Sequence, residues 1–405
     1  MIADKFEHAA RYCCLAMVAC LSFTTAGANL ALVAFIICAL ISKKWVTDFH
    51  LIWKHPVAQL SIACFFVLCL SQLWSGVEAE LSWAWISKYK KLFLIPMVIP
   101  FFQRREYKVA LFHTLFISLL LGLVVSYTNY FGLTEVGDCP AVGCTAHSYI
   151  TLSMLNCLLF IMAIAFFKQE KVFIKKALIA SVAFFAWLNI VSILPSRTGQ
   201  ILIFVLIVWF PFVIWNGNFV SRRMKWVSFI SAVMFVGLSL GAIYATKGSR
   251  LVESIEKISS HKAEAFNSKS ASVSVDVRFE FYKKSLVLIG EKPLLGWGAG
   301  AHEPKLLSMS SEGEVVFSNP HNEYLLWLLQ TGVLGLFIFL CWLCVVWRYS
   351  RRVVNFDEKV ILQGWLLIFI LGSFLNSFLL DFSEGYMTAF LIAALTPFRI
   401  NEELP

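Results

Sequence analysis

Charge is scarce in this chain of 405 residues, because Asp, Glu, Lys and Arg make up 15% of it, against about 25% in soluble domains. Hydrophobic residues make up 59%, and the mean hydropathy is +0.75. Apolar runs as long as a membrane-spanning helix recur along the whole sequence. These features exclude an ordinary soluble domain and predict an all-α, polytopic membrane protein. In that class the net charge of +9 indicates loop orientation rather than binding of nucleic acid.

Three further signals are missing. No cleavage site follows the first apolar run, so that run is expected to be the first span. No carboxylate cluster resembles a metal-binding Asp-x-Asp motif, so we expect no divalent cation and no cofactor. Most of the eleven cysteines lie inside apolar runs, which excludes a disulfide framework. Cys139 and Cys144 differ, because the short polar loop "GDCPAVGC" would allow a disulfide in an oxidising compartment.

The apolar runs predict about twelve spans. Their approximate ranges are 12–24, 27–42, 56–74, 84–102, 109–131, 148–167, 177–195, 199–216, 226–245, 321–347, 360–380 and 385–398. Lys and Arg gather in one set of short loops, such as "QRREYK" and "SRRMK". The opposite set, "TTAGAN", "LPSRTGQ" and "DFSEGY", holds one arginine. This asymmetry places both termini in the cytoplasm and the second set of loops outside.

The chain is expected to have three parts. Residues 1–245 hold nine spans with short loops, residues 246–320 form one large and partly helical outer loop, and residues 321–405 hold three spans and a short cytoplasmic tail. No internal repeat and no inverted symmetry of the transporter type is evident.

Basic side chains gather on the outer side. Arg197 lies at the tip of the tight turn "ILPSRTGQIL", Arg278 lies in "DVRFEFYKKS", and Lys88 and Lys91 lie in "SWAWISKYKKLFLIP". Arg250 in "KGSRLVES" has weaker grounds. Guanidinium groups bind phosphate oxygens in pairs and stay charged at physiological pH, so these residues would suit a lipid with a phosphate headgroup. The alternatives are a snorkelling arginine, an interfacial aromatic belt and a solvated helix face.

His321 stands at the start of an apolar helix, in "NPHNEYLLWLLQTGVLG". Neutral imidazole is a competent general base near neutral pH. Gly332 follows eleven residues later, close to three helical turns, and Gly335 stays near that stripe, so a neighbouring helix is expected to pack closely below the histidine. A His–Asn cap above a small-residue packing motif is the alternative.

These residues together resemble the O-antigen ligase (WaaL) family, in the group that includes O-antigen polymerases and protein O-oligosaccharyltransferases. The family pattern, His-[Asn/Ser/Gln], nine residues and Gly-x-x-[Gly/Thr/Tyr], matches His321-Asn322, "EYLLWLLQT" and "GVLG". Arg197 and Arg278 fit the two arginines that the family needs, and "EKPLLGWGAGAHEP" resembles the segment that precedes its histidine.

The resemblance implies a fold similar to glycosyltransferases of the GT-C type, with a large periplasmic loop. It implies that O-antigen polysaccharide passes from undecaprenyl diphosphate to a sugar hydroxyl of lipid A–core, without metal and with inversion, at the periplasmic face of a Gram-negative inner membrane. His321 would deprotonate or orient the acceptor hydroxyl, while Arg197 and Arg278 would bind the diphosphate.

Further residues are expected to support that site. Lys88, Lys91 and Arg250 are candidate donor contacts, and Asn322 and Glu323 are candidate substrate contacts. Glu323 and Asp381 are also candidates for tuning the histidine. Two alternatives stay open: a polymerase or protein O-oligosaccharyltransferase that uses the same donor, and a transporter of lipid-linked glycan. A transporter predicts ionisable residues at mid-membrane, where these spans have few.

Overall fold

The computed structural model describes residues 2–137, 143, 145, 147–215, 222–245, 273–310 and 319–397. Throughout these residues the regular structure is helical, without a strand. The chain divides into two compact units, one formed by Met1–Leu115 with Asp276–Pro405 and the other by Phe116–Val275. Cys139, Cys144 and Arg250 lie outside the described residues, as does much of the predicted outer loop, so the predictions about them stay predictions.

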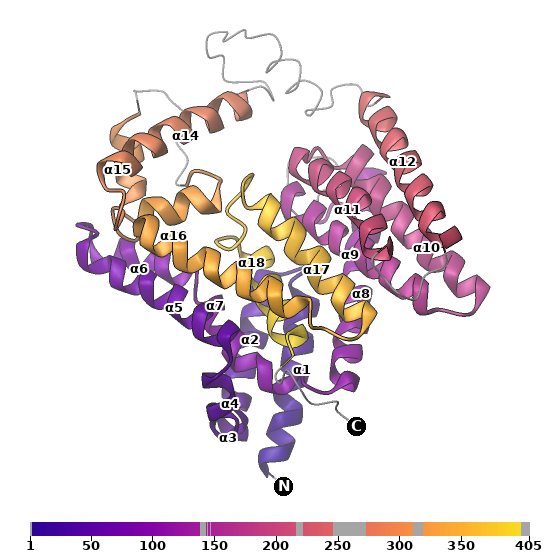
Figure 1. Ribbon diagram of the computed structural model, residues 1–405, viewed down its shortest axis with the longest axis horizontal. Helices are drawn as coiled ribbons and strands as arrows, with labels where there is room; N and C mark the ends of the chain where they lie inside the picture. Colours follow the sequence, from indigo (N-terminus) through magenta and orange to yellow (C-terminus); the bar gives the residue numbers. More distant parts are fainter. Residues whose placement is uncertain are drawn as a thin grey trace. The chain divides into compact units, whose positions relative to one another are not determined.

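The first unit holds most of the helices (Figure 1). They are α1 (Ile2–Cys20), α2 (Thr25–Ser42), α3 (Lys44–Thr47), α4 (Phe49–Trp53), α5 (Pro56–Ser71), η1 (Gln72–Trp74), α6 (Ala79–Ser87), α7 (Lys91–Val98), η2 (Ile99–Phe101), α15 (His302–Ser308), α16 (Glu323–Ser350), α17 (Phe356–Gly372) and α18 (Phe382–Leu395). Helix α14 (Val273–Glu291) belongs to it from Asp276 onward. Within this unit α1 packs on α2, α5 on α16 and α7 on α18.

The second unit begins within α8 (Arg105–Tyr130). Its other helices are α9 (Tyr149–Gln169), α10 (Phe173–Leu188), the π-helical turn η3 (Asn189–Ile193), α11 (Arg197–Trp215) and α12 (Arg222–Ala245). Helix α9 packs on α10 and α11, and α11 packs on α12.

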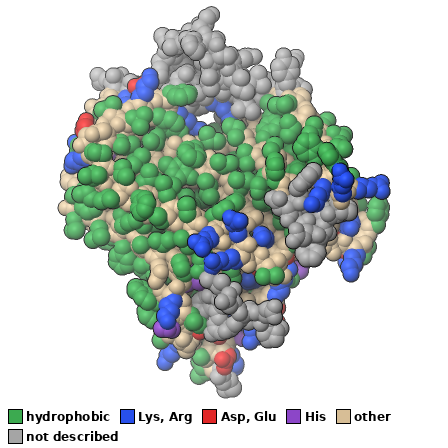
Figure 2. Space-filling view, in the orientation of Figure 1, with side chains coloured by type: hydrophobic (Ala, Val, Ile, Leu, Met, Phe, Trp, Pro, Cys, Tyr) green, Lys and Arg blue, Asp and Glu red, His purple; other side chains and the backbone are tan. Residues whose placement is uncertain are grey.

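Seven helical segments among the described residues are long and apolar enough to cross a membrane. They are Thr25–Ser42, Pro56–Trp74, Arg105–Tyr130, Tyr149–Gln169, Phe173–Ile193, Lys225–Ile243 and Glu323–Ser350. Shorter apolar helices cover Lys91–Phe101, Arg197–Val213 and Phe382–Leu395. Figure 2 shows hydrophobic side chains over much of the visible face, as expected for surfaces that contact lipid. The prediction of an all-helical polytopic membrane protein is confirmed, while the number twelve stays a prediction.

One predicted span is wrong in its form. The range 84–102 was expected to be a single helix, but the structure divides it into α6, a turn at Lys88–Lys90 and α7, followed by η2. Lys88 and Lys90 of "SKYKK" occupy this turn, where an ammonium group avoids the cost of a position on a lipid-facing helix, and Lys91 begins α7. The segment therefore presents its lysines at the junction of two short helices.

The predicted glycine stripe below His321 is wrong at Gly332. There α16 is broken, because Gly332 adopts φ 64° and ψ −166°, which is not helical. The loop that follows α14 docks at the break: the amides of Trp297 and Gly298 donate to the carbonyls of Leu329 (2.7 Å) and Gln330 (3.0 Å). The amide of Val333 donates in turn to the carbonyl of Pro293 over 2.8 Å. The glycine thus admits a loop backbone rather than a neighbouring helix.

Gly335 behaves as the sequence predicts. A Cβ atom added at this position would lie 3.2 Å from the side chain of Val67 on α5, so α5 and α16 approach closely here. The two glycines of the motif therefore have different roles, one in a break and one in helix packing.

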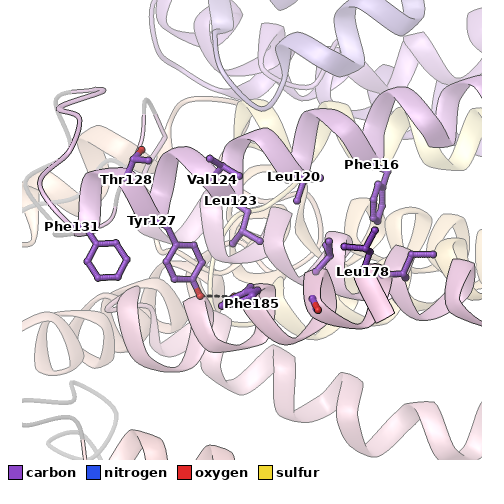
Figure 3. A pocket seen from close by; sticks show the side chains of 12 residues that line it. Phe116, Leu120, Leu123, Val124, Tyr127, Thr128, Phe131, Leu178 and Phe185 are labelled. Carbon is purple, nitrogen blue, oxygen red and sulfur yellow. Dashed lines mark hydrogen bonds between the residues drawn. The ribbon is translucent and has the colours of Figure 1, made fainter. Parts of the chain in front are cut away.

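An apolar groove of about 630 Å³ lies in the second unit, between α8 and α10 (Figure 3). Phe116, Leu123 and Phe131 line it from α8, and Leu178 and Phe185 line it from α10. The hydroxyl of Tyr127 also lies here but donates to the carbonyl of Phe185 over 2.9 Å. The groove therefore suits hydrocarbon rather than a charged headgroup.

Candidate active site

The backbone at His321 is held in an unusual conformation. Its φ of 49° lies in the left-handed region, which among the described non-glycine residues is shared only by Lys43. The amide of His321 donates to Oδ1 of Asn319 over 2.7 Å, and the hydroxyl of Tyr282 lies 3.5 Å from its carbonyl oxygen. A left-handed histidine persists only where its surroundings hold it, and such residues cluster at functional sites.

The imidazole contacts a residue that the sequence did not single out. Nδ1 of His321 lies 2.9 Å from Oδ1 of Asn376, in the segment between α17 and α18. Nδ2 of Asn376 in turn donates to Oδ2 of Asp381 over 2.8 Å. A chain of hydrogen bonds therefore joins the histidine to a half-buried carboxylate. No local signal in the sequence marks Asn376, because its role depends on a contact across 55 residues.

Arg278 on α14 acts electrostatically on the same histidine. Its positive charge lies close enough to His321 and to Tyr282 to affect the pKa of both side chains. Burial lowers the pKa of His321 from its usual 6.5, the hydrogen bond with Asn376 opposes that shift, and Arg278 adds to it. The net direction is downward, so the imidazole is neutral at neutral pH. The charge of Arg278 thus acts on His321, while a shared site for the two side chains stays a prediction.

Asn322 is the N-cap of α16. Its Oδ1 accepts hydrogen bonds from the amides of Tyr324 (3.0 Å) and Leu325 (3.1 Å), and its Nδ2 donates to the carbonyl of Phe374 (3.1 Å). These contacts anchor the start of α16 to the segment after α17. They are structural contacts, and the predicted contact of Asn322 with substrate stays a prediction.

Glu323 is fully buried and makes four hydrogen bonds. Its Oε1 accepts from the hydroxyl of Tyr89 (2.9 Å) and from Nε1 of Trp327 (3.1 Å). Its Oε2 accepts from the amides of Leu379 (3.0 Å) and Leu380 (3.2 Å). This carboxylate connects the α6–α7 junction, α16 and the segment before α18. The geometry favours a structural role, and a direct substrate contact stays a prediction.

The two predicted lysines lie near Asp381. Lys91 is buried, and its Nζ donates to the carbonyls of Leu380 (3.1 Å) and Asp381 (2.5 Å). Lys88 is exposed, and its Nζ lies 4.0 Å from the centroid of the Trp85 ring. Both ammonium groups are close enough to Asp381 to act on its carboxylate. Lys91 therefore orders the start of α18, while Lys88 remains accessible.

Arg197 belongs to the second unit, where it begins α11. A hydrogen-bond network holds this turn: Oγ of Ser196 accepts from the amide of Gly199 (3.1 Å) and lies 2.9 Å from Oγ of Ser153 on α9. One turn further along α9, Asn156 donates to Oδ1 of Asn189 over 2.8 Å. The convergence of Arg197 with His321 and Arg278 stays a prediction.

Among the described residues, no three His, Cys, Asp or Glu side chains come together as a metal ion would require. The expected independence of metal and cofactor stays a prediction.

These features define a polytopic membrane protein, helical throughout the described residues, with a neutral histidine that the charge of an arginine reaches. The sequence model of the O-antigen ligase family matches residues 182–340, a segment that includes Arg197, Arg278 and His321. This segment of the chain is similar to the O-antigen ligase family. No curated protein matches the chain. The family implies a glycosyltransferase-like activity of the O-antigen ligase or polymerase type, with a lipid-linked polysaccharide as donor.

Proposed function

We propose that this protein is an O-antigen ligase that completes lipopolysaccharide. It transfers O-antigen polysaccharide from undecaprenyl diphosphate to a sugar hydroxyl of lipid A–core, at the periplasmic face of a Gram-negative inner membrane. Both termini lie in the cytoplasm, and neither a metal ion nor another cofactor takes part. The family match supports the donor class, and the His-Asn and Gly-x-x-Gly pattern supports ligation over the other reactions of the group.

The proposal rests on His321, whose left-handed backbone and hydrogen bond with Asn376 fix an imidazole that is neutral at neutral pH and is reached by the positive charge of Arg278. Nε2 of His321 takes the proton of the acceptor hydroxyl while that oxygen bonds to the anomeric carbon of the donor sugar. The bond from this carbon to the diphosphate oxygen breaks, and its electron pair leaves with the phosphate. One displacement of this kind inverts the anomeric configuration.

The departing diphosphate gains negative charge, which cations must stabilise. Arg278 and Arg197 supply this charge in the proposal, because a guanidinium can donate two parallel hydrogen bonds to phosphate. The accessible Lys88 is a further donor contact, and Arg250 is a candidate whose position lies outside the described residues. Lys91, Asn322 and Glu323 support the site by holding its helices.

Acceptor choice is the experiment that tests the proposal. Purified protein in nanodiscs is given undecaprenyl-diphosphate glycan together with lipid A–core, with a second donor molecule alone, or with an acceptor protein. We expect a product with lipid A–core and none with the other two. Chain extension of the donor would identify a polymerase, and a glycosylated protein would identify an oligosaccharyltransferase. Absence of any product, with glycan moved across the bilayer, would favour transport.

A further inference from the structure

The orientation of the Asn376 amide can be derived from its two neighbours. Asn376 is 7% exposed and lies between the imidazole of His321 and the carboxylate of Asp381. An ionised carboxylate only accepts hydrogen bonds, so the NH₂ group of Asn376 must face Asp381. The amide oxygen then faces His321, and an amide oxygen also only accepts. The proton of the neutral imidazole must therefore reside on Nδ1, which leaves the lone pair on Nε2.

Asp381 is held ionised by charges from several elements. Burial raises the pKa of Asp381 to about 6, while Lys91 on α7, Lys88 at the end of α6 and the hydrogen bond from Asn376 oppose the rise. The carboxylate of Glu323 on α16 is also close enough to interact with that of Asp381. Arg278 on α14 is the charged group that acts on the imidazole itself. At neutral pH the carboxylate is ionised and the imidazole is neutral, which is the state that the amide orientation requires.

We propose that Asp381, acting through Asn376, fixes the Nδ1–H tautomer of His321 and so keeps Nε2 as the proton acceptor. The inference rests on the proposed role of His321 as general base. Asn376 and Asp381 are positioning residues in this arrangement, because neither contacts the reacting atoms. Both also lie outside the segment 182–340 that the family model matches, so that match does not identify them.

The buried position of Asn376 supports this role over simple solvation. Its two hydrogen bonds join His321, which precedes α16, to Asp381, which precedes α18. Nδ2 of Asn322 and the hydroxyl of Tyr282 both donate to the carbonyl of Phe374, over 3.1 Å and 3.0 Å. The segment that carries Asn376 is thereby tied to the segments that carry His321 and Arg278.

The test exchanges the two side chains. In Asp381→Asn the obligate acceptor is gone, the amide of Asn376 can rotate, and its NH₂ group can face Nδ1. The proton then moves to Nε2, and kcat should fall by at least about 100-fold with little change in KM for the donor. In the double variant Asn376→Asp with Asp381→Asn, a carboxylate accepts directly from Nδ1, so the Nδ1–H tautomer and much of kcat should return.

The double variant also predicts a pH shift that a purely structural role would not produce. A carboxylate beside the imidazole stabilises its charged form, so the pKa of His321 should rise and the acid limb of the kcat/KM profile should move to higher pH. Thr388→Val is the matched control, because it removes a buried hydrogen bond between Thr388 and Trp365 elsewhere in the unit. It should leave kcat and the pH profile unchanged.

Thermal unfolding in detergent is measured for every variant. Wild-type kcat in Asp381→Asn would overturn the inference. So would a folded double variant that stays as inactive as Asp381→Asn or keeps the wild-type pH profile. If wild-type protein transfers no glycan to any acceptor, the proposed function fails instead, and the two failures are thereby distinguished.

Discussion

The turn that carries Arg197 leaves no room for a side chain at Gly199. A Cβ atom at this position would lie under 3.0 Å from Cβ and Oγ of Ser153, and 3.2 Å from Oγ of Ser196. Contacts under 3.0 Å are not tolerated without movement, and the neighbour here is the short side chain of a packed helix. The substitution Gly199→Ala must therefore displace either the first turn of α11 or α9.

The expected cost follows from these contacts. Overpacking by one methyl group in a packed interior costs about 1–3 kcal/mol, and loss of the hydrogen bond from the Gly199 amide to Ser196 Oγ adds about 1 kcal/mol. Displacement of the turn also moves Arg197. Because a shift of about 1 Å at a positioning group can cost about 100-fold in rate, transfer should fall by more than stability alone explains.

The assay compares single and double variants of the purified protein. Gly199→Ala should lower both the unfolding temperature and kcat, and Ser153→Gly in the same chain should restore much of both, because it removes the atoms that clash. Gly237→Ala on α12 is the control, since nothing lies within 4 Å of a Cβ atom added there. The reasoning is refuted if Gly199→Ala is as stable and active as wild type, or if Ser153→Gly recovers neither property.

Four more predictions follow from the first unit. In a pH profile, kcat/KM should fall as His321 is protonated, and the acid limb should lie below pH 6.5 because the pKa of His321 is lowered. Protonation of Asp381 at low pH should lower kcat/KM in the same direction. An acid limb above pH 6.5 would contradict the lowered pKa of His321. Arg278→Lys should lower kcat/KM at least about tenfold, since lysine cannot donate two parallel hydrogen bonds to phosphate. A kcat/KM equal to that of wild type would mean that position 278 needs only a positive charge. Glu323→Gln should destabilise the protein by about 1–3 kcal/mol in thermal unfolding, because an amide group cannot accept all four hydrogen bonds. Gly332→Ala should detach the loop that contains Trp297 from α16, because the added Cβ atom would lie under 3.0 Å from the backbone of Leu294. The detached loop should be cleaved faster by a protease between α14 and α15. An unchanged rate of proteolysis would count against docking of this loop on α16.

Local patterns were sufficient for most helices. Apolar runs gave the spans at 27–42, 148–167 and 226–245, and the structure has helices at Thr25–Ser42, Tyr149–Gln169 and Arg222–Ala245. These predictions succeed because a helix in a bilayer satisfies its own backbone, so its length and hydropathy reside in one stretch of sequence. The proximity of Arg278 to His321 came from the family pattern rather than from local chemistry.

Features that depend on distant partners were not predictable in this way. Gly332 was assigned to a straight helix, because nothing local indicates that a loop 35 residues earlier docks at its backbone through Trp297. Asn376 was missed for the same reason, since an asparagine after an apolar helix usually marks a simple turn. The contacts of Lys91 with carbonyl groups 289 and 290 residues away were likewise invisible locally, and its contact with the donor stays a prediction.

The central claim is that His321 accepts a proton during transfer from a lipid-linked donor. Its most direct test is a single-turnover measurement with His321→Asn, because asparagine tolerates the left-handed backbone at φ 49° but cannot serve as the base. We expect the variant to bind undecaprenyl-diphosphate glycan within a few-fold of wild type and to transfer it at least about 100-fold more slowly. Transfer at the wild-type rate by this variant would contradict it.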